Sequence, residues 1–255
     1  MLTSLNDSRS IVNRSPDLHF AKLGKHWRNP LAINLKSTRG AAADGVKVLV
    51  YGGAGAGKTT LIGTLPDPII ISAEAGLLSL ADLDIPYIEV TDMASLREAY
   101  SYVASKEASA FKSIAIDSIS EIAEVVLSYE KKNNKDPRAA YGEMQTQMAD
   151  LIRAFRDLTG KNVYMSAKME KVQDESGRIL YGPSMPGKLL PQSLPYFFDE
   201  VLALRVEKDD EGKSQRALMC DSDGLWSAKD RSGKLDAWET ADLSYIINKI
   251  AGNTK

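Results

Sequence analysis

One stretch, Gly52-Gly53-Ala54-Gly55-Ala56-Gly57-Lys58-Thr59, constrains this chain more than any other feature. It fits G-x-x-x-x-G-K-[ST], a pattern typical of a phosphate-binding loop between a strand and a helix. The flanking segments agree, because residues 46–51 read as a buried strand and residues 59–65 as a helix. The bland alternative is a glycine-rich turn. We predict a P-loop in which the strand runs into the glycines and the helix leaves them.

The residue types of this loop match the chemistry of phosphate binding. Glycines allow backbone N–H groups to turn inward, and the start of a helix adds partial positive charge. We expect Lys58 to reach the β- and γ-phosphates and the Thr59 hydroxyl to hold Mg²⁺. The predicted nucleotide-binding residues are Gly52, Gly53, Ala54, Gly55, Ala56, Gly57, Lys58, Thr59 and Thr60.

Composition narrows the class of protein. The 255 residues are 44% hydrophobic and 26% charged, which is ordinary for a globular protein. The net charge of −2 means that any nucleic acid would need a local basic patch. Cys220 has no second cysteine to pair with, which indicates a reducing compartment. No apolar run approaches ~20 residues, and the first residues lack a signal-peptide core. We therefore expect no membrane partner and a cytoplasmic location.

Strand and helix patterns alternate after residue 45. This order indicates an α/β fold with a mainly parallel central sheet flanked by helices. An antiparallel hairpin over residues 200–220 is expected to extend the sheet, and a helix near residues 243–250 to close the domain. The predicted core strands are 46–51, 68–72, 113–117 and 162–167, and the predicted helices between them are 94–106, 119–127 and 144–158.

Residues 1–44 differ from the rest of the chain. They are polar and weakly periodic, and they carry an excess of basic over acidic side chains. We predict a basic N-terminal arm and linker over residues 1–44, partly ordered at most, followed by one domain over residues 45–255. Whether the arm contacts DNA or packs on a neighbouring subunit stays open.

Two carboxylates complete the predicted site. A P-loop site needs an acid at the end of another strand, and Asp117 ends the strand 113–117, so we assign it to Mg²⁺. Its alternative role, capping the next helix, can be filled by Ser118. Glu74 follows the strand 68–72 and should face the same sheet edge as the P-loop. Position alone leaves open whether Glu74 orients water or is a solvated loop acid.

The order P-loop, strand–Glu, strand–Asp-Ser, helix and strand resembles the RecA-type ATPase core over residues 46–240. It is similar to phage-encoded ATPases of that superfamily, which are implicated in single-strand annealing and recombination. The resemblance implies ATP and Mg²⁺ as cofactors, Glu74 as the catalytic base and Asp117 as the Walker B acid. It also implies the cytosol of a bacterial host. Lys168 departs from the Gln or His that many relatives carry as a γ-phosphate sensor.

A second motif lies near the end of the chain. Lys229-Asp230-Arg231-Ser232-Gly233 is similar to the K-x-R-x-G stretch of RecA-superfamily ATPases. The resemblance implies that Lys229 and Arg231 are catalytic and reach a neighbour's γ-phosphate, as an arginine finger does. ATP would then lie between protomers of a homo-oligomeric ring or filament. The bland alternative is a charged surface turn.

RecA-type proteins bind single-stranded DNA through two loops. The matching segments here are 131–141, before the long helix, and 169–195, after the fourth core strand. Cations beside aromatic rings suit phosphate tracking and base stacking, although such segments are also common solvated surface. The predicted DNA-binding residues are Lys131, Lys132, Lys135, Arg138, Tyr141, Lys171, Arg178 and Lys188.

Three functions follow from these observations. The leading prediction is a DNA-stimulated ATPase that binds single-stranded DNA and serves recombination by annealing or strand pairing. The second is an ATP-driven helicase or branch-migration motor on the same core. The third is an ATP-binding adaptor or assembly protein with little hydrolysis. It stays open whether the oligomer is a ring or a filament, and whether a single-strand-binding protein is a further partner.

Overall fold

The computed structural model describes residues 38, 44–74, 76–208 and 210–253. Contacts group residues 38–255 into one compact unit. The predicted arm over residues 1–44 lies almost wholly outside the described residues, so it stays a prediction. None of the helices described combines the length and the apolar character needed to cross a bilayer.

The core of this unit is one mostly parallel sheet. Its strands follow the order β10-β8-β7-β1-β5-β4-β2-β3, with β6 paired to β5 and β9 paired to β7. Strands β1, β2, β3, β4, β5 and β7 run parallel, whereas β6, β8, β9 and β10 are added antiparallel. The bounds are β1 Lys47–Gly52, β2 Pro68–Ser72, β3 Tyr87–Glu89, β4 Ser113–Asp117, β5 Asn162–Gln173, β6 Ile179–Ser184, β7 Glu200–Lys208, β8 Ser214–Met219, β9 Lys229–Asp230 and β10 Trp238–Thr240. The predicted fold class and the C-terminal hairpin, β7–β8, are confirmed.

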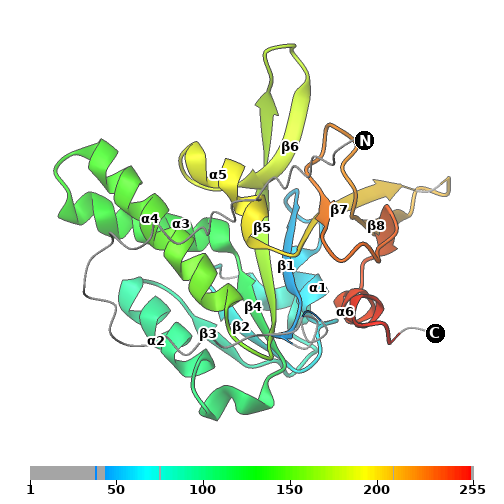
Figure 1. Ribbon diagram of the computed structural model, residues 1–255, viewed down its shortest axis with the longest axis horizontal. Coiled ribbons are helices and arrows are strands. Elements are labelled where there is room, and N and C mark those ends of the chain that lie inside the picture. The colour runs from blue at the N-terminus through cyan, green and yellow to red at the C-terminus, as the bar shows by residue number, and fades with distance from the viewer. Residues whose placement is uncertain (1–37, 39–43, 75, 209, 254–255) are drawn as a thin grey trace, which may run out of the picture. The chain divides into compact units, whose positions relative to one another are not determined.

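Helices cover both faces of the sheet (Figure 1). Helices α2, α3 and α4 share one apolar cluster with the sheet, and α1 and α6 share the other. Their bounds are α1 Lys58–Ile62, α2 Met93–Val103, α3 Ile119–Asn133, α4 Pro137–Arg156, α5 Leu189–Ser193 and α6 Leu243–Ala251, with 3₁₀ turns η3 Leu77–Leu80, η4 Glu107–Ala110 and η5 Leu194–Phe197.

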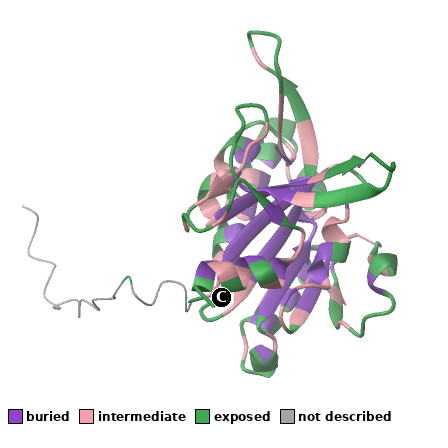
Figure 2. Ribbon diagram, turned by 90° about the vertical axis from the view of Figure 1, so that its right-hand side faces the viewer, coloured by how far each residue is buried: buried purple, intermediate pink, exposed green. Residues whose placement is uncertain are grey.

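The central strands are buried because both of their faces are covered. In β1, Leu49 and Tyr51 pack with α2, α3 and α4, while Val48 and Val50 pack with α1 and α6. This period of two divides one continuous apolar run between two clusters. Figure 2 shows these strands buried through the middle of the molecule and exposed hairpins beyond them.

The prediction that residues 169–195 form a loop is wrong. Strand β5 continues to Gln173 and pairs with β6 as a hairpin that projects from the sheet, and α5 follows (Figure 1). Its turn is fixed by Asp174, which accepts hydrogen bonds from the N–H groups of Ser176 and Arg178, and by Gly177 with φ 81°. Charged residues and glycines interrupt the apolar residues of the hairpin, so its sequence lacks the continuous apolar run of a buried strand.

The hairpin is fastened to the body by an aromatic stack. The rings of Tyr181 on β6 and Trp226 stack with centroids 4.3 Å apart, and the guanidinium of Arg205 on β7 lies 4.3 Å from the Trp226 centroid. The hydroxyl of Tyr51 also donates a hydrogen bond to the Tyr181 carbonyl over 3.2 Å. The hairpin is therefore held against the strands that flank it.

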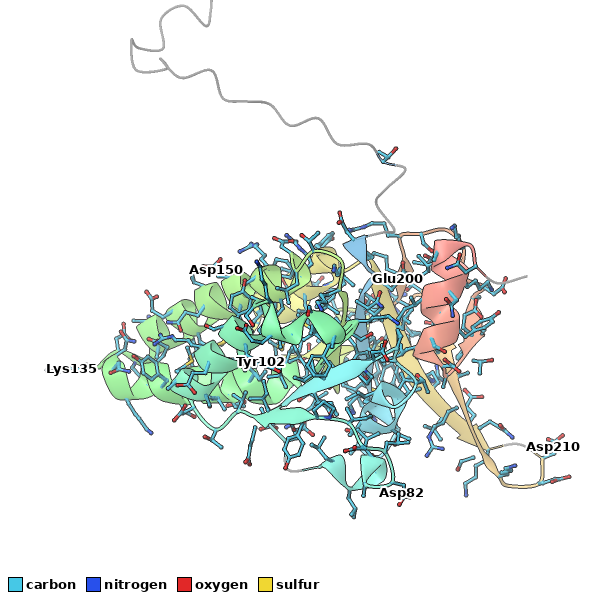
Figure 3. The ribbon with its side chains drawn as sticks, turned by 90° about the horizontal axis from the view of Figure 1, so that it is seen from below. Asp82, Tyr102, Lys135, Asp150, Glu200 and Asp210 are labelled. Atoms are coloured by element: carbon cyan, nitrogen blue, oxygen red, sulfur yellow. The ribbon has the colours of Figure 1, made fainter. Side chains whose placement is uncertain are left out.

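The prediction that residues 131–141 form a loop is also wrong. Helix α3 runs to Asn133 and α4 begins at Pro137, so most of the segment is helical. Asp136 caps α4 by accepting a hydrogen bond from the Arg138 N–H, and proline suits the first helical position. The two helices pack side by side, and Lys135 lies at their far end (Figure 3).

A buried carboxyl group stands out at the start of β7. Glu200 is fully buried, and neither of its carboxyl oxygens has a hydrogen-bond partner among the described residues. Burial, together with the negative charge of Asp230, raises the pKa of Glu200 to about 8. Folding therefore favours the protonated carboxyl group.

We expect Glu200→Gln to change how stability depends on pH. A carboxyl group whose pKa is raised in the folded state stabilises the fold below its unfolded pKa, near 4.5, and this stabilisation is lost as pH rises toward 8. The wild-type free energy of unfolding should fall by a few kcal/mol across this window relative to the variant. Urea titrations from pH 5 to 8.5 measure the difference, with Glu207→Gln at the exposed end of the strand as control. Parallel pH profiles would contradict the expectation.

Candidate nucleotide-binding site

The predicted P-loop lies at the centre of the sheet. Strand β1 sits between β5 and β7, and the loop after it leads into α1 at Lys58. Gly55 and Gly57 have φ values of 72° and 102°, a left-handed conformation that favours glycine. The strand, glycine loop and helix predicted from the sequence are thus present in order.

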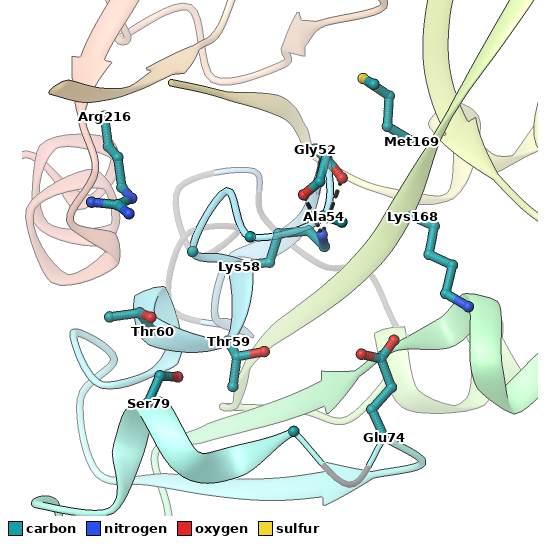
Figure 4. A pocket seen from close by; sticks show the side chains of 14 residues that line it. Gly52, Ala54, Lys58, Thr59, Thr60, Glu74, Ser79, Lys168, Met169 and Arg216 are labelled. Carbon is teal, nitrogen blue, oxygen red and sulfur yellow. Dashed lines mark hydrogen bonds between the residues drawn. The ribbon is translucent and has the colours of Figure 1, made fainter. Parts of the chain in front are cut away.

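The loop borders a cavity of about 610 Å³ (Figure 4). Its lining comes from the loop itself, from the segment after β2, from β5 and from β8. The lining residues are Gly52, Gly53, Ala54, Gly55, Gly57, Lys58, Thr59, Thr60, Glu74, Gly76, Ser79, Lys168, Met169 and Arg216. All predicted nucleotide-binding residues except Ala56 are among them.

Lys58 lies folded over the loop. Its amino group donates hydrogen bonds to the carbonyl oxygens of Gly52 at 3.0 Å and Gly53 at 3.1 Å (Figure 4). Burial lowers the pKa of Lys58, while the carboxylates of Asp117 and Glu74 oppose that effect. The amino group therefore lies inside the cavity, near two carboxylates.

Asp117 joins three elements of the site. Its side chain, 2% exposed at the end of β4, accepts a hydrogen bond from the Thr59 hydroxyl over 2.6 Å. The hydroxyl of Ser166, on β5, donates a second hydrogen bond to the other carboxyl oxygen. Burial raises the pKa of Asp117, and the two hydroxyl groups act against that rise. Ser118, as predicted, caps α3 by accepting from the Glu121 N–H.

Glu74 lies in the same cavity, at the end of β2. Its carboxylate accepts a hydrogen bond from the Ser118 hydroxyl over 2.5 Å. Ser118 directly follows Asp117, so the two predicted carboxylates are brought to one sheet edge, as expected for the ends of neighbouring parallel strands. Glu74 is thus placed beside the loop rather than on an isolated surface.

Lys168 also reaches the cavity. It ends the segment of β5 that pairs with β1, opposite Gly52, and its amino group forms an ion pair with Glu121 of α3. In Figure 4 its side chain lies on the Glu74 side of the cavity. The departure from Gln or His therefore places a second cation beside Lys58.

The residues present suit Mg²⁺ bound together with a nucleotide. Thr59 and Asp117 supply adjacent hard oxygen atoms, the ligand type that Mg²⁺ prefers. Within the described ranges no cluster of three or more His, Cys, Asp or Glu could hold a metal ion. When a nucleotide is bound, phosphates and water would be the other ligands of Mg²⁺.

The structure does not bring Lys229 and Arg231 to the P-loop of their own chain. Strand β9 pairs with Glu200 and Val201, at the end of β7 opposite the P-loop edge. The amino group of Lys229 donates to the carbonyl oxygens of Pro195 and Phe198, both at 2.6 Å. Arg231 forms an ion pair with Asp199 at 2.9 Å. Their role at a neighbour's nucleotide stays a prediction.

The two predicted DNA segments partly meet. Gly187 packs against α4, because a Cβ atom there would lie 3.7 Å from the Tyr141 ring and 2.7 Å from the Gln145 amide. Lys188 follows directly, and Lys131 lies 5.3 Å from the centroid of the same Tyr141 ring. All of these cations are exposed, as are Lys132, Lys135 and Arg138.

The remaining predicted DNA-binding residues lie on the projecting hairpin. Lys171 is exposed, with its amino group 5.7 Å from the centroid of the Tyr181 ring. Arg178, in the turn, is paired with Asp174 at 2.8 Å, which offsets its charge. The basic residues are therefore divided between the helical tip and the hairpin (Figure 1).

Sequence reasoning placed Ser166 in the segment that matches the γ-phosphate sensor but missed its contact with Asp117, and it missed Arg216 altogether. Ser166 lies in a predicted strand but carries no motif that marks it as a partner of Asp117. Arg216 comes from β8, and its Nε atom donates to the Ala56 carbonyl over 2.9 Å. Only the pairing of β7 with both β1 and β8 brings Arg216 to the loop, and no local pattern reports that pairing.

Comparison with known families agrees with this geometry. A family model described as an AAA domain matches residues 44–232, well over half of the chain. A search of curated proteins gives no match. The matched range contains the P-loop, Glu74 and Asp117. The chain belongs to the AAA domain family and is an AAA-type P-loop ATPase.

Proposed function

We propose that this protein is a RecA-type ATPase that binds single-stranded DNA and uses ATP to control that binding during recombination, by annealing or strand pairing. One observation carries the proposal. Strand β5 contributes Ser166 and Lys168 to the nucleotide site and continues directly into the hairpin that carries Lys171. The proposed ATP site and the projecting hairpin, which carries the exposed Lys171, therefore share one strand.

The site supports hydrolysis of ATP by water. Glu74 lies where it would orient water toward the γ-phosphate, and Lys58 supplies positive charge at the phosphates. Mg²⁺, when bound by Thr59 and Asp117, would neutralise charge on the phosphates. Lys168 adds a second cation on the Glu74 side of the cavity. A cation there would stabilise the negative charge that develops on the γ-phosphate during hydrolysis.

Ser120 links the catalytic edge to the hairpin. This residue of α3 lies three positions after Asp117. Its hydroxyl accepts from the Lys168 N–H over 2.9 Å and donates to the Ser184 carbonyl over 2.7 Å. Lys168 and Ser184 are opposite residues at the base of the hairpin. Movement of the Asp117 segment would thus be transmitted to both strands of the hairpin.

We further propose that the active species is a homo-oligomer with ATP between protomers. Strand β9, with Lys229, lies at the end of the sheet opposite the P-loop of its own chain, so the proposed action of Lys229 and Arg231 on ATP would be on a neighbour's nucleotide. Arg231 is exposed over about half of its side chain and is held by Asp199. In this arrangement Asp199 would keep the guanidinium extended for the next subunit.

We expect Glu74→Gln to separate ATP binding from hydrolysis. The amide keeps the size of the side chain but cannot accept a proton, so hydrolysis should fall roughly 10²- to 10⁴-fold with ATP affinity nearly unchanged. Lys58→Ala should lose both, because it removes the cation at the phosphates. Phosphate release and equilibrium binding of ATP measure the two effects.

Glu89→Gln is the matched control, because Glu89 ends the neighbouring strand β3, opposite Ser72. It should hydrolyse ATP at the wild-type rate. Turnover by Glu74→Gln at the wild-type rate would remove Glu74 from the proposed mechanism and would favour an adaptor with a different use of ATP.

The DNA surface predicts a specific salt dependence. Replacing Lys131, Lys135 and Lys188 by Gln should weaken binding of a labelled single-stranded oligonucleotide. The slope of log affinity against log salt should decrease by about 2, because each lost phosphate contact removes about 0.7. Fluorescence anisotropy at salt concentrations from about 50 to about 300 mM measures this slope.

Lys106→Gln, Lys112→Gln and Lys208→Gln together form the matched control, with the same change in charge on other surfaces. An equal loss of affinity in both triple variants would show that only net charge matters. A strand-displacement assay on a forked duplex completes the test, since ATP-driven unwinding would replace annealing by a motor.

We expect Ser120→Ala to reduce the stimulation of ATP hydrolysis by single-stranded DNA. The variant loses the hydroxyl bridge at the base of the hairpin but none of the groups in the cavity. Hydrolysis without DNA should stay within about threefold of wild type, since a lost hydrogen bond changes stability by only about 1 kcal/mol. Ser113→Ala, at the other end of β4, is the control. Full stimulation in Ser120→Ala would exclude this route.

A further inference from the structure

An arginine from outside the P-loop is fixed on the loop. Arg216 lies on β8, opposite Val206 of β7, and β7 pairs with β1. Its Nε atom donates a hydrogen bond to the Ala56 carbonyl over 2.9 Å. The antiparallel extension of the sheet, which the motif does not include, thus supplies a cation to the loop from the same subunit.

The loop is shaped to receive this side chain. A Cβ atom on Gly57 would lie 3.0 Å from Arg216 Nε and 3.4 Å from its Cδ, which is tighter than ordinary contact. Gly57 therefore serves two needs, a φ of 102° and space for the guanidinium group. The close approach places the arginine directly against the residue that precedes Lys58.

Arg216 has donors left over at this position. A guanidinium group carries five N–H donors, and the hydrogen bond to Ala56 uses one of them. Among the described residues no carboxylate forms an ion pair with it. An arginine held by one carbonyl, lining a cavity and unpaired by acid, is suited to bind an anion.

The position of Arg216 indicates which part of a nucleotide it faces. Figure 4 shows Arg216 and Thr60 on one side of Lys58, and Glu74 and Lys168 on the other. Under the proposed mechanism the γ-phosphate lies on the Glu74 side, next to the Thr59 hydroxyl that is bound to Asp117. The opposite end receives the α- and β-phosphates, which the backbone of the loop surrounds.

We propose that Arg216 binds the α- and β-phosphates of the nucleotide held by the P-loop of its own subunit. This inference rests on the proposed nucleotide site. It adds a cation that acts on binding of nucleoside di- and triphosphates alike, distinct from the cations that act on the γ-phosphate. Arg216 is thus a binding residue rather than an arginine finger.

The test compares three ligands in the presence of Mg²⁺: ADP, a non-hydrolysable ATP analogue and inorganic tripolyphosphate. Arg216→Ala should weaken all three by a similar factor of about ten or more, as expected when a charge-assisted hydrogen bond is lost. Arg216→Lys, which keeps the charge, should recover part of the affinity. Arg97→Ala, an exposed arginine on α2, should bind as wild type. Titration calorimetry measures each dissociation constant.

Each other outcome overturns a defined part of the proposal. A loss confined to the ATP analogue and tripolyphosphate, with ADP unaffected, would place Arg216 at the γ-phosphate. A loss confined to the two nucleotides would place it at the base or ribose. Full affinity in Arg216→Gln, which can still donate to Ala56, would make it a structural support of the loop. Failure of the wild type to bind any of the three would instead reject the nucleotide site itself.

Discussion

The arrangement of the site depends on one buried carboxyl group. Asp117 is removed from water, and an ionised group in such a place needs hydrogen-bond donors to be stable. The donors come from Thr59 at the start of α1 and from Ser166 on β5. A slip of β5 by one residue would present Met165 or Ala167 instead, both of which pack in the apolar cluster on the other face. The register of the central strands and the polar contacts of the site therefore support each other.

Both projections of the molecule begin at this edge of the sheet. Helix α3 follows Asp117 after Ser118 and leads to the end of the helix pair that carries Lys131 and Lys135. The hairpin begins at Lys168, where β5 leaves β1. Two surfaces that lie apart in Figure 1 are thus rooted in adjacent strands, β4 and β5. Both surfaces therefore begin within a few residues of the Asp117 and Ser166 side chains of the candidate site.

The sequence predicted those parts of the site that follow from local pattern. The P-loop is continuous in the chain, and Glu74 and Asp117 follow from the rule that parallel strands end at one edge. Arg216 could not be found, because its contact with Ala56 depends on a pairing across 160 residues. The prediction of a loop at the hairpin is wrong because charged residues and glycines interrupt its apolar residues, of which Val172 and Ile179 are themselves exposed. Local sequence patterns therefore do not predict contacts between residues far apart in the chain, or strands that are exposed to solvent.

The stack of Tyr181 on Trp226 is the second point at which the hairpin is held to the body of the protein. Trp226 also borders a cavity of about 420 Å³ together with Gly53, Ala54, Gly55 and Ala56. The hairpin is thus anchored at its base by Ser120 and again, farther out, by a ring that adjoins the P-loop. The contacts that hold the hairpin are therefore shared with residues that border the P-loop.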